Sequence, residues 1–245
     1  MLTKDLAICL RVLDYSETSQ IVTFFTRANG KISAIAKGSK RAKSAFDGPV
    51  EAFSLGKIVF TQTTNEKLAT LTEFEQEPPF THLSTDLFAL NCSLFCAELV
   101  NCLTNEYDPH SQLFDQFVQF LKNSQDFKGK SSALAMLVLF QLTLLQEIGL
   151  QLILKICVNC KNSFNDAWPE TYFSSTANGL ICRDCEPNFA DKIRLTKPAA
   201  NCLGNLKMIA QADEKTLNEI EKVMVYHFTE LLHRPPKMAK YILKN

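Results

Sequence analysis

The hydrophobic pattern of this chain changes its period once, near residue 80. In the first part apolar residues recur at every second position, and Leu6, Ile8, Leu10 and Val12 form the first run of this kind. Similar runs, rich in β-branched and aromatic residues, follow at residues 19–26, 31–37, 55–63 and 67–75. Such alternation is typical of a strand with one buried face. Five short strands without a long helical pattern predict a small closed β-barrel.

An oligonucleotide-binding (OB) barrel fits this strand count, and an SH3-like barrel fits it nearly as well. Counting strands does not distinguish the two, so both interpretations stay open at this level. Glu73, Glu75 and Glu77 alternate at the end of the fifth run. We interpret these three carboxylates as a solvated face and not as a cation site, because no further acidic cluster lies near them in the sequence.

The period becomes helical after Pro78-Pro79, where we place a domain boundary. Apolar residues then recur at three- and four-residue intervals, and they predict helices over 83–103, from Asp108-Pro109 onward and over 133–148. The first of these helices is apolar on two sides, so we expect it at the centre of a bundle. The fold class is therefore α+β, with a barrel at residues 1–80 and a helical domain at residues 81–245.

Local signals predict where several helices begin and end. Ser131 or Ser132 is expected to cap the third helix, and Gly149 to close it. Thr196 followed by Pro198 predicts the start of a helix over 197–211. Asp213 is expected to cap a longer helix that Pro235-Pro236 stops. The last residues, 237–245, carry three lysines and no acid, and we expect a disordered, solvated tail in preference to a second DNA-facing segment.

Two Cys-x-x-Cys pairs form the strongest chemical pattern of the sequence. Cys157 and Cys160 are separated by 21 residues from Cys182 and Cys185. Two such turns can bring four thiolates to one point, which is the tetrahedral sulfur site that Zn²⁺ prefers. An iron–sulfur centre or a thiol-redox pair are the alternatives. A closed site of four cysteines leaves no open coordination position, so we expect a structural zinc within a module at residues 155–190.

The other polar residues give no comparable pattern. Cys92, Cys96 and Cys102 lie among leucines, and we expect them to pack as small apolar side chains. The four histidines are scattered, and no phosphate-binding loop, zinc-protease motif or nucleophile–base pair is present in the sequence. We therefore expect no enzymatic activity. The N-terminus has no signal-peptide pattern, and nine cysteines without one favour the reducing cytoplasm.

A local charge imbalance lies between residues 27 and 43. The whole chain has 26 basic and 26 acidic residues, so any binding of a polyanion must come from a patch. This stretch contains no acid, and its six basic residues are Arg27, Lys31, Lys37, Lys40, Arg41 and Lys43. Charge alone fits a solvated hairpin turn as well as a polyanion-binding loop.

In order and spacing the chain resembles the RecO family of bacterial DNA repair proteins. The resemblance rests first on Tyr15-Ser16-Glu17-Thr18-Ser19 leading into residues 21–26. It rests also on Gly30-Lys31 with Ala36-Lys37-Gly38 and the basic residues beyond, and on the segment 178–182 that precedes the second cysteine pair. The chain departs from the family pattern at Asn178-Gly179, where two glycines are frequent, and in its C-terminal segment.

The resemblance implies an OB-fold barrel and a recombination mediator with no catalytic site. Such a protein would bind single- and double-stranded DNA, anneal complementary strands and act at the nucleoid. With RecR it would load RecA onto DNA coated by single-strand-binding protein (SSB), whose acidic tail it would bind in the helical domain. The alternative function is that of a zinc-ribbon protein that binds RNA or acts in transcription.

On this interpretation all six basic residues of the stretch 27–43 are candidate phosphate contacts. Single-strand binding also needs aromatic rings on which bases stack. Tyr15, Phe24 and Phe25 are the candidates, and we expect at least two of them to belong to the barrel core.

Overall fold

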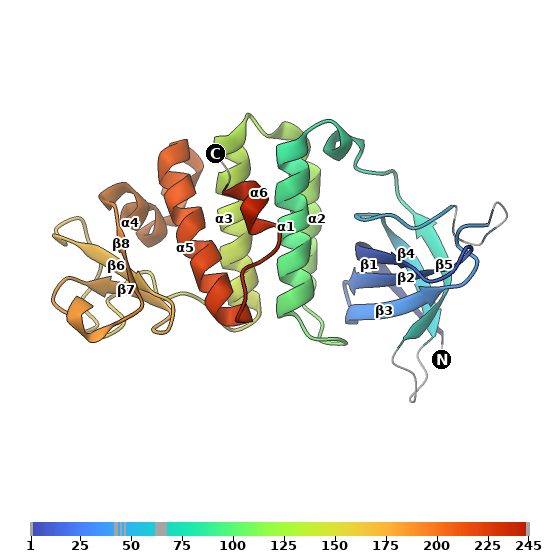
Figure 1. Ribbon diagram of the computed structural model, residues 1–245, viewed down its shortest axis with the longest axis horizontal. Coiled ribbons are helices and arrows are strands. Elements are labelled where there is room, and N and C mark those ends of the chain that lie inside the picture. The colour runs from blue at the N-terminus through green and yellow to red at the C-terminus, as the bar shows by residue number, and fades with distance from the viewer. Residues whose placement is uncertain (1, 42–43, 45, 47, 62–67, 244–245) are drawn as a thin grey trace. The chain divides into compact units, whose positions relative to one another are not determined.

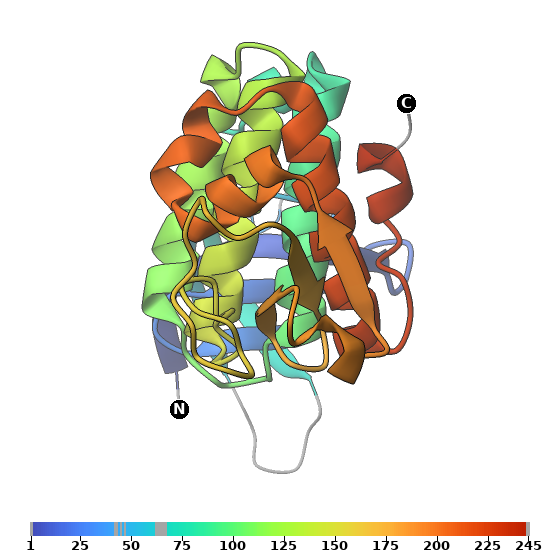
Figure 2. The same cartoon turned by 90° about the vertical axis from the view of Figure 1, so that its left-hand side faces the viewer.

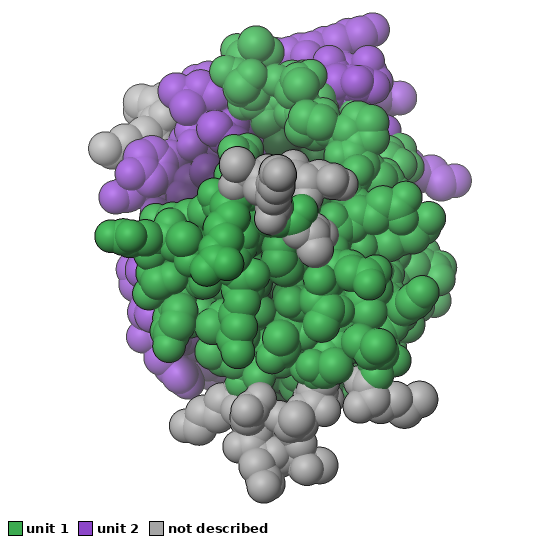
Figure 3. Space-filling model, turned by 90° about the vertical axis from the view of Figure 1, so that its right-hand side faces the viewer, with its two compact units in different colours: residues 1–85, 100–122 green, residues 86–99, 123–245 purple. Residues whose placement is uncertain are grey.

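The structure is a computed structural model of the 245-residue chain, and it describes residues 2–41, 44, 46, 48–61 and 68–243. The chain forms two compact units (Figure 3). Unit 1 comprises residues 1–85 and 100–122, and unit 2 comprises residues 86–99 and 123–245. Within the described residues, no helix is long and apolar enough to cross a membrane.

Five strands of unit 1 close into a barrel in the order β1-β2-β3-β5-β4 (Figure 1). Their bounds are Leu2–Asp14 for β1, Gln20–Thr26 for β2, Gly30–Ala36 for β3, Leu55–Thr61 for β4 and Ala69–Gln76 for β5. All neighbours pair antiparallel except β3 and β5, which pair parallel. This order and closure are those of the OB fold, so the structure decides between the two barrels that the strand count left open.

The barrel interior is filled by the alternating residues that predicted its strands. Phe24 and Phe74 meet edge to face at 5.3 Å between ring centroids, and both are buried. Strand β1 is longer than its apolar run predicted, and a bulge between Cys9 and Arg11 changes its register against β2. A bulge turns the strand locally, which lets one long strand pair with both β2 and β4.

The helix expected over 83–103 begins later than predicted. A 3₁₀ turn, Thr81–Ser84, comes first, and α1 spans Leu87–Leu103. The delay has a local cause, because the Asp86 carboxylate accepts hydrogen bonds from the backbone N–H groups of Phe88 and Ala89, at 2.9 and 3.0 Å. Asp86 therefore acts as the cap of α1.

Helix α2, Ser111–Asn123, belongs to unit 1 and packs on the barrel. Its apolar face carries Phe114, 5.9 Å from Phe25 of β2 between ring centroids, and Phe117, 6.4 Å from Phe53. All four rings are buried. The segment 100–122 thus covers barrel side chains that residues 1–80 alone would leave exposed.

The core of unit 2 contains α3, Lys130–Glu147, against α5, Glu214–Leu232. Asp213 caps α5 as expected, accepting the Thr216 N–H at 2.8 Å. The cap expected at Ser131 or Ser132 is wrong: Gly129 precedes α3, with φ of 81°, and no side chain caps that helix. Gly149 follows α3 with φ of 80°, the left-handed conformation expected of a closing glycine.

The helix expected over 197–211 is broken at Asn205. Helix α4 spans Lys197–Gly204, capped by Thr196 as expected, and a 3₁₀ segment, Leu206–Gln211, follows. The Gly204 carbonyl accepts a hydrogen bond from Lys155 Nζ, and the Phe164 ring lies where a Cβ on Gly204 would be. These contacts fix the end of α4 against another part of unit 2, which no local pattern could reveal.

Residues 237–243 are also ordered, contrary to the solvated tail expected over 237–245, of which residues 244–245 lie outside the described residues. Residues Ala239–Ile242 form a short helix, α6, with both terminal residues of that helix buried. The Glu98 carboxylate of α1 accepts the N–H groups of Lys237 and Met238, both at 2.8 Å. Apolar burial and this charged cap hold residues 237–243 against the helices of unit 2.

A small antiparallel sheet completes unit 2, in the order β7-β6-β8. Its strands are Thr171–Ser174 (β6), Gly179–Cys182 (β7) and Lys192–Leu195 (β8). In both ribbon views this sheet lies beside α4 and α5 (Figures 1 and 2).

Candidate nucleic-acid interface and metal centre

The basic stretch divides into two parts with different surroundings. Arg27, at the turn between β2 and β3, forms a bidentate ion pair with Asp115 of α2, with both N–O distances 2.9 Å. The hydrogen bonds and the opposite charge raise the pKa of Arg27 and lower that of Asp115. Arg27 is exposed, but its guanidinium is already engaged by a carboxylate.

Lys31 is engaged more deeply. Its Nζ donates to the carbonyl oxygens of Asn101 and Thr104, at 2.5 and 2.6 Å, where α1 ends. Burial lowers the pKa of this lysine. Its own carbonyl accepts the Tyr107 N–H at 3.0 Å. A cation at the carbonyl end of a helix is favourable, so Lys31 fastens the end of α1 to the barrel.

The turn itself fits closely against the same segment. Gly30 has φ of +69°, and a Cβ there would lie 2.2 Å from the Asp108 carbonyl oxygen. Only glycine permits that approach. The residues 27–31 therefore form a contact surface for the segment 101–115, a role that sequence reasoning missed because the partners lie 70 or more residues away.

Beyond β3 the remaining cations lie on a loop over residues 37–41. Lys37 and Arg41 are exposed, and Lys40 Nζ contacts the Asp14 carboxylate at the end of β1. Lys43, the sixth candidate, lies outside the described residues. The loop is anchored by buried Gln20, whose Oε1 accepts the Ser39 hydroxyl at 2.8 Å.

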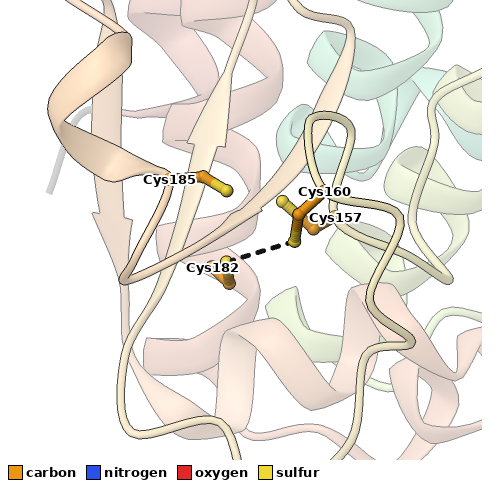
Figure 4. A group of neighbouring side chains, drawn as sticks. All are labelled: Cys157, Cys160, Cys182 and Cys185. Carbon is orange, nitrogen blue, oxygen red and sulfur yellow. Dashed lines mark hydrogen bonds between the residues drawn. The ribbon is translucent and has the colours of Figure 1, made fainter.

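The four paired cysteines meet at one point in unit 2. All four Sγ atoms of Cys157, Cys160, Cys182 and Cys185 lie within 4.8 Å of one another. Figure 4 shows the first pair on one loop, facing the second pair at the end of β7. The Cys160 and Cys182 sulfurs are 3.7 Å apart. A tetrahedral zinc with bonds of about 2.3 Å would set its sulfurs about 3.8 Å apart, so the residues fit a zinc ion.

Each cysteine pair is held by a tight turn. Cys157 donates its N–H to the Asn162 carbonyl and its own carbonyl accepts the Lys161 N–H, at 2.8 and 3.0 Å. In the second turn, the Cys185 N–H reaches the Cys182 carbonyl at 3.1 Å. Burial raises the pKa of Cys157, but hydrogen bonds from neighbouring N–H groups outweigh it and lower the pKa to about 7. A thiol that ionises near neutral pH is suited to metal binding.

A small core supports this centre. Three of the cysteines pack with Trp168 and Ile181, and Phe164 meets Trp168 edge to face at 5.3 Å. The Trp168 indole N–H donates to the Ser163 carbonyl at 3.0 Å. Gly179 is required at the start of β7, since a Cβ there would lie 2.3 Å from the Ile153 carbonyl oxygen. The module has few apolar residues, so the cysteine cluster is its central contact.

The other groups singled out in the sequence form no site of their own among the described residues. Cys92 and Cys96 are fully buried in α1, in agreement with the expected core packing, whereas Cys102 is half-buried. Glu73 and Glu77 are exposed, and Glu75 lies 3.7 Å from Lys57. Among the described residues, the four paired cysteines form the one cluster of potential metal ligands.

A closed OB barrel with a basic loop is followed by a helical unit whose small sheet and loops hold a four-cysteine cluster. These features define the class of this protein: an OB-fold protein with a zinc-type module. The chain belongs to the RecO family of DNA repair proteins. The family model described as Recombination protein O N terminal matches residues 1–80, and the one described as Recombination protein O C terminal matches residues 84–240.

Individual relatives agree over nearly the whole length. The DNA repair protein RecO of Alkaliphilus metalliredigens (strain QYMF) is 33% identical over 228 residues, which cover 92% of this chain and 86% of the relative. The RecO proteins of Bacillus pumilus (strain SAFR-032) and Bacillus subtilis (strain 168) are each 30% identical, covering 94% of this chain and 89% of each relative. The resemblance inferred from the sequence is thereby confirmed.

Proposed function

We propose that this protein is a non-catalytic recombination mediator that binds single- and double-stranded DNA and anneals complementary strands. The observation that carries the proposal is the cationic loop beside the barrel, with exposed Lys37 and Arg41. Annealing needs no active site. It needs cations that neutralise the phosphates of both DNA strands, so that the two strands can approach each other with their bases unpaired.

Among the six basic candidates we assign phosphate contact to Lys37, Lys40, Arg41 and Lys43. Arg27 and Lys31 bind protein groups of the segment 101–115 instead, and reaching DNA would require them to leave those partners. Lys40 must likewise exchange its contact with the Asp14 carboxylate for a phosphate. Single-strand binding by all six would give a log–log salt slope of up to about −4, whereas the four assigned here give about −3.

The four cysteines are proposed to hold one structural Zn²⁺. When bound, zinc would link the turn 157–160 to the turn 182–185 and so replace the large apolar core that the module lacks. Because all four positions around the metal would be filled by sulfur, the ion would take no direct part in binding or chemistry.

The binding site for the acidic tail of SSB is assigned to the helical domain, residues 81–245. We propose RecR as the partner in loading RecA, and the acidic tail of SSB as the ligand that recruits the protein to coated DNA. The candidate site is a hollow of about 370 Å³ beside α5, which is lined by the cations Lys215 and Lys222, by apolar Leu243, and by Asn218 and Glu219. Titrating a tail peptide against the full chain and a Lys215→Glu/Lys222→Glu variant tests this assignment.

The deciding experiment for DNA binding replaces the four assigned cations with glutamine. We expect weaker binding to both DNA forms, a single-strand salt slope reduced by about 3, and slow annealing of SSB-coated strands. The matched control is Lys4→Gln/Lys57→Gln, which removes two exposed lysines of β1 and β4 on the same barrel. Unchanged DNA affinity in the folded four-site variant would exclude the proposal, and a preference for structured RNA would favour an RNA-binding function.

A further inference from the structure

The barrel carries one aromatic ring that is not used in its core. The phenylalanines within the barrel strands and their connections, residues 2–76, are at positions 24, 25, 46, 53, 60 and 74, and all are buried, with at most 6% of their surface exposed. Tyr15 is 62% exposed. It lies in the turn between β1 and β2, where packing does not explain a large aromatic side chain. Of the three residues proposed from the sequence to stack on bases, Phe24 and Phe25 are therefore part of the buried interior. Only Tyr15 of these three is accessible to a ligand.

The turn that presents Tyr15 is tightly closed. The N–H groups of Tyr15 and Ser16 both donate to the Ser19 carbonyl, at 3.0 and 3.2 Å. The Ser16 hydroxyl oxygen in turn accepts the Ser19 N–H at 3.1 Å. A ring on a backbone held in this way loses little further freedom when a flat ligand stacks on it.

The same turn is tied to the cationic loop. The Lys40 N–H donates to the Thr18 carbonyl at 3.1 Å, and the Gly38 N–H donates to the Ser19 hydroxyl at 3.1 Å. The Lys40 ammonium contacts the carboxylate of Asp14, the residue directly before Tyr15. The turn 14–19 and the loop 37–41 therefore form one surface, and this surface includes both the exposed Tyr15 and the cations of the loop.

We propose that Tyr15 is the base-stacking residue of this surface, and that its partner is an unpaired nucleobase of single-stranded DNA whose phosphates lie along Lys37, Lys40 and Arg41. This inference rests on the proposed function of the loop as a DNA-binding site. Stacking accepts every base, so it gives affinity for single strands without sequence preference. A base in a duplex is already stacked between its neighbours, so the ring should distinguish single strands from duplex.

Two substitutions test the stacking contact by fluorescence anisotropy with labelled oligo(dT) and a duplex of equal length. We expect Tyr15→Ala to weaken oligo(dT) binding by about 5- to 150-fold, the range of one stacked base, and to leave duplex binding and the salt slope unchanged. Tyr15→Phe keeps the ring and should bind both DNA forms as the parent does. Equal binding of oligo(dT) by Tyr15→Ala and the parent would overturn the proposal, as would equal weakening toward both DNA forms.

A direct readout comes from Tyr15→Trp, since the chain has a single native tryptophan, Trp168, whose signal can be subtracted with the parent protein. Stacking predicts quenching of the new indole by oligo(dT) and none by duplex. The four-site glutamine variant separates the two proposals. If that variant loses DNA affinity while Tyr15→Ala does not, the stacking role alone fails; if neither variant loses affinity, the DNA-binding role of the loop fails with it.

Discussion

A buried carboxyl in unit 2 should make the stability of this protein depend on pH. Glu221 of α5 is fully buried, and its Oε1 accepts a hydrogen bond from Gln141 Nε2 of α3 at 2.8 Å. Gln141 Oε1 and Glu221 Oε2 are both buried, and among the described residues neither has a hydrogen-bond partner. The site thus contains more acceptors than donors. A proton on Glu221 supplies the missing donor.

Among the described residues, no cation forms an ion pair with Glu221. Cys92 and Cys96 of α1 face this carboxyl, and burial raises the pKa of both thiols, so they stay neutral. Burial also raises the pKa of Glu221 from 4.5 to about 7, against the smaller opposite effect of the Gln141 hydrogen bond. In the unfolded chain the same carboxyl ionises near its usual value.

The sign of the effect follows from these two pKa values. Since the folded pKa is the higher one, the contribution of Glu221 to stability is fully present below about pH 4.5. It is lost as the pH rises through about 7, because ionisation then costs more in the folded protein. At about 1.4 kcal/mol per pKa unit, the full loss is about 3 kcal/mol. That is a large part of the total stability of a typical domain, about 5–15 kcal/mol.

Glu221→Gln tests this reasoning, because the amide keeps the shape of the side chain and cannot ionise. Urea denaturation followed by Trp168 fluorescence, which reports on unit 2, gives the free energy of unfolding of parent and variant at about pH 5 and about pH 8. We expect the variant to gain about 2–3 kcal/mol relative to the parent between these two pH values. Effects of pH on the cysteine cluster are common to both proteins and cancel in the difference.

The matched control is Glu230→Gln, an exposed glutamate of the same helix, which should show no such pH-dependent gain. If the difference between Glu221→Gln and the parent is the same at both pH values, Glu221 does not change its pKa on folding and the reasoning is refuted.

Three further predictions concern the two candidate sites. Removing metal with a chelator, or replacing Cys182 with Ser, should lower the melting temperature and release one zinc per chain, measured by calorimetry and metal analysis; normal stability without metal contradicts a structural zinc. Lys31→Met should destabilise unit 1 by about 1–3 kcal/mol, because it leaves two carbonyl groups without their donor, while the salt slope of DNA binding stays that of the parent. Asp14→Asn should strengthen DNA binding at low salt, since it frees Lys40 from its carboxylate, and a weaker or unchanged affinity in anisotropy titrations would count against phosphate contact by Lys40.

The five barrel strands and most of the long helices followed from local patterns in the sequence, whereas the small sheet β7-β6-β8 was not predicted. Alternation of apolar residues is a property of neighbouring positions, so it identified the strands of the barrel before their order was known. The Asp213 cap and the two cysteine pairs are equally local, because each needs only a few residues to set its geometry. Family resemblance then supplied the OB fold, which the strand order β1-β2-β3-β5-β4 confirms.

The ends of helices and the conformation of the C-terminal segment were less predictable, because contacts with residues distant in the sequence determine them. The break after α4 depends on Lys155 and Phe164, and the ordered C-terminal segment depends on Glu98 of α1. None of these three partners is near its target in sequence. The predicted cap of α3 was wrong for a different reason. The N-cap position is occupied by Gly129, in an unusual backbone conformation, and not by a serine.

The sequence by itself determined that this protein has a barrel, a helical part, two cysteine pairs able to form one cluster and a patch of positive charge. Only the tertiary structure decided what each charge of that patch does. Arg27 and Lys31 lie four residues apart and carry the same charge as Lys37 and Arg41, yet they are bound to the segment 101–115 while the others face solvent. The physical reason is that the partner of a charged side chain is set by the folding of distant segments, whereas its charge is set by its own chemistry.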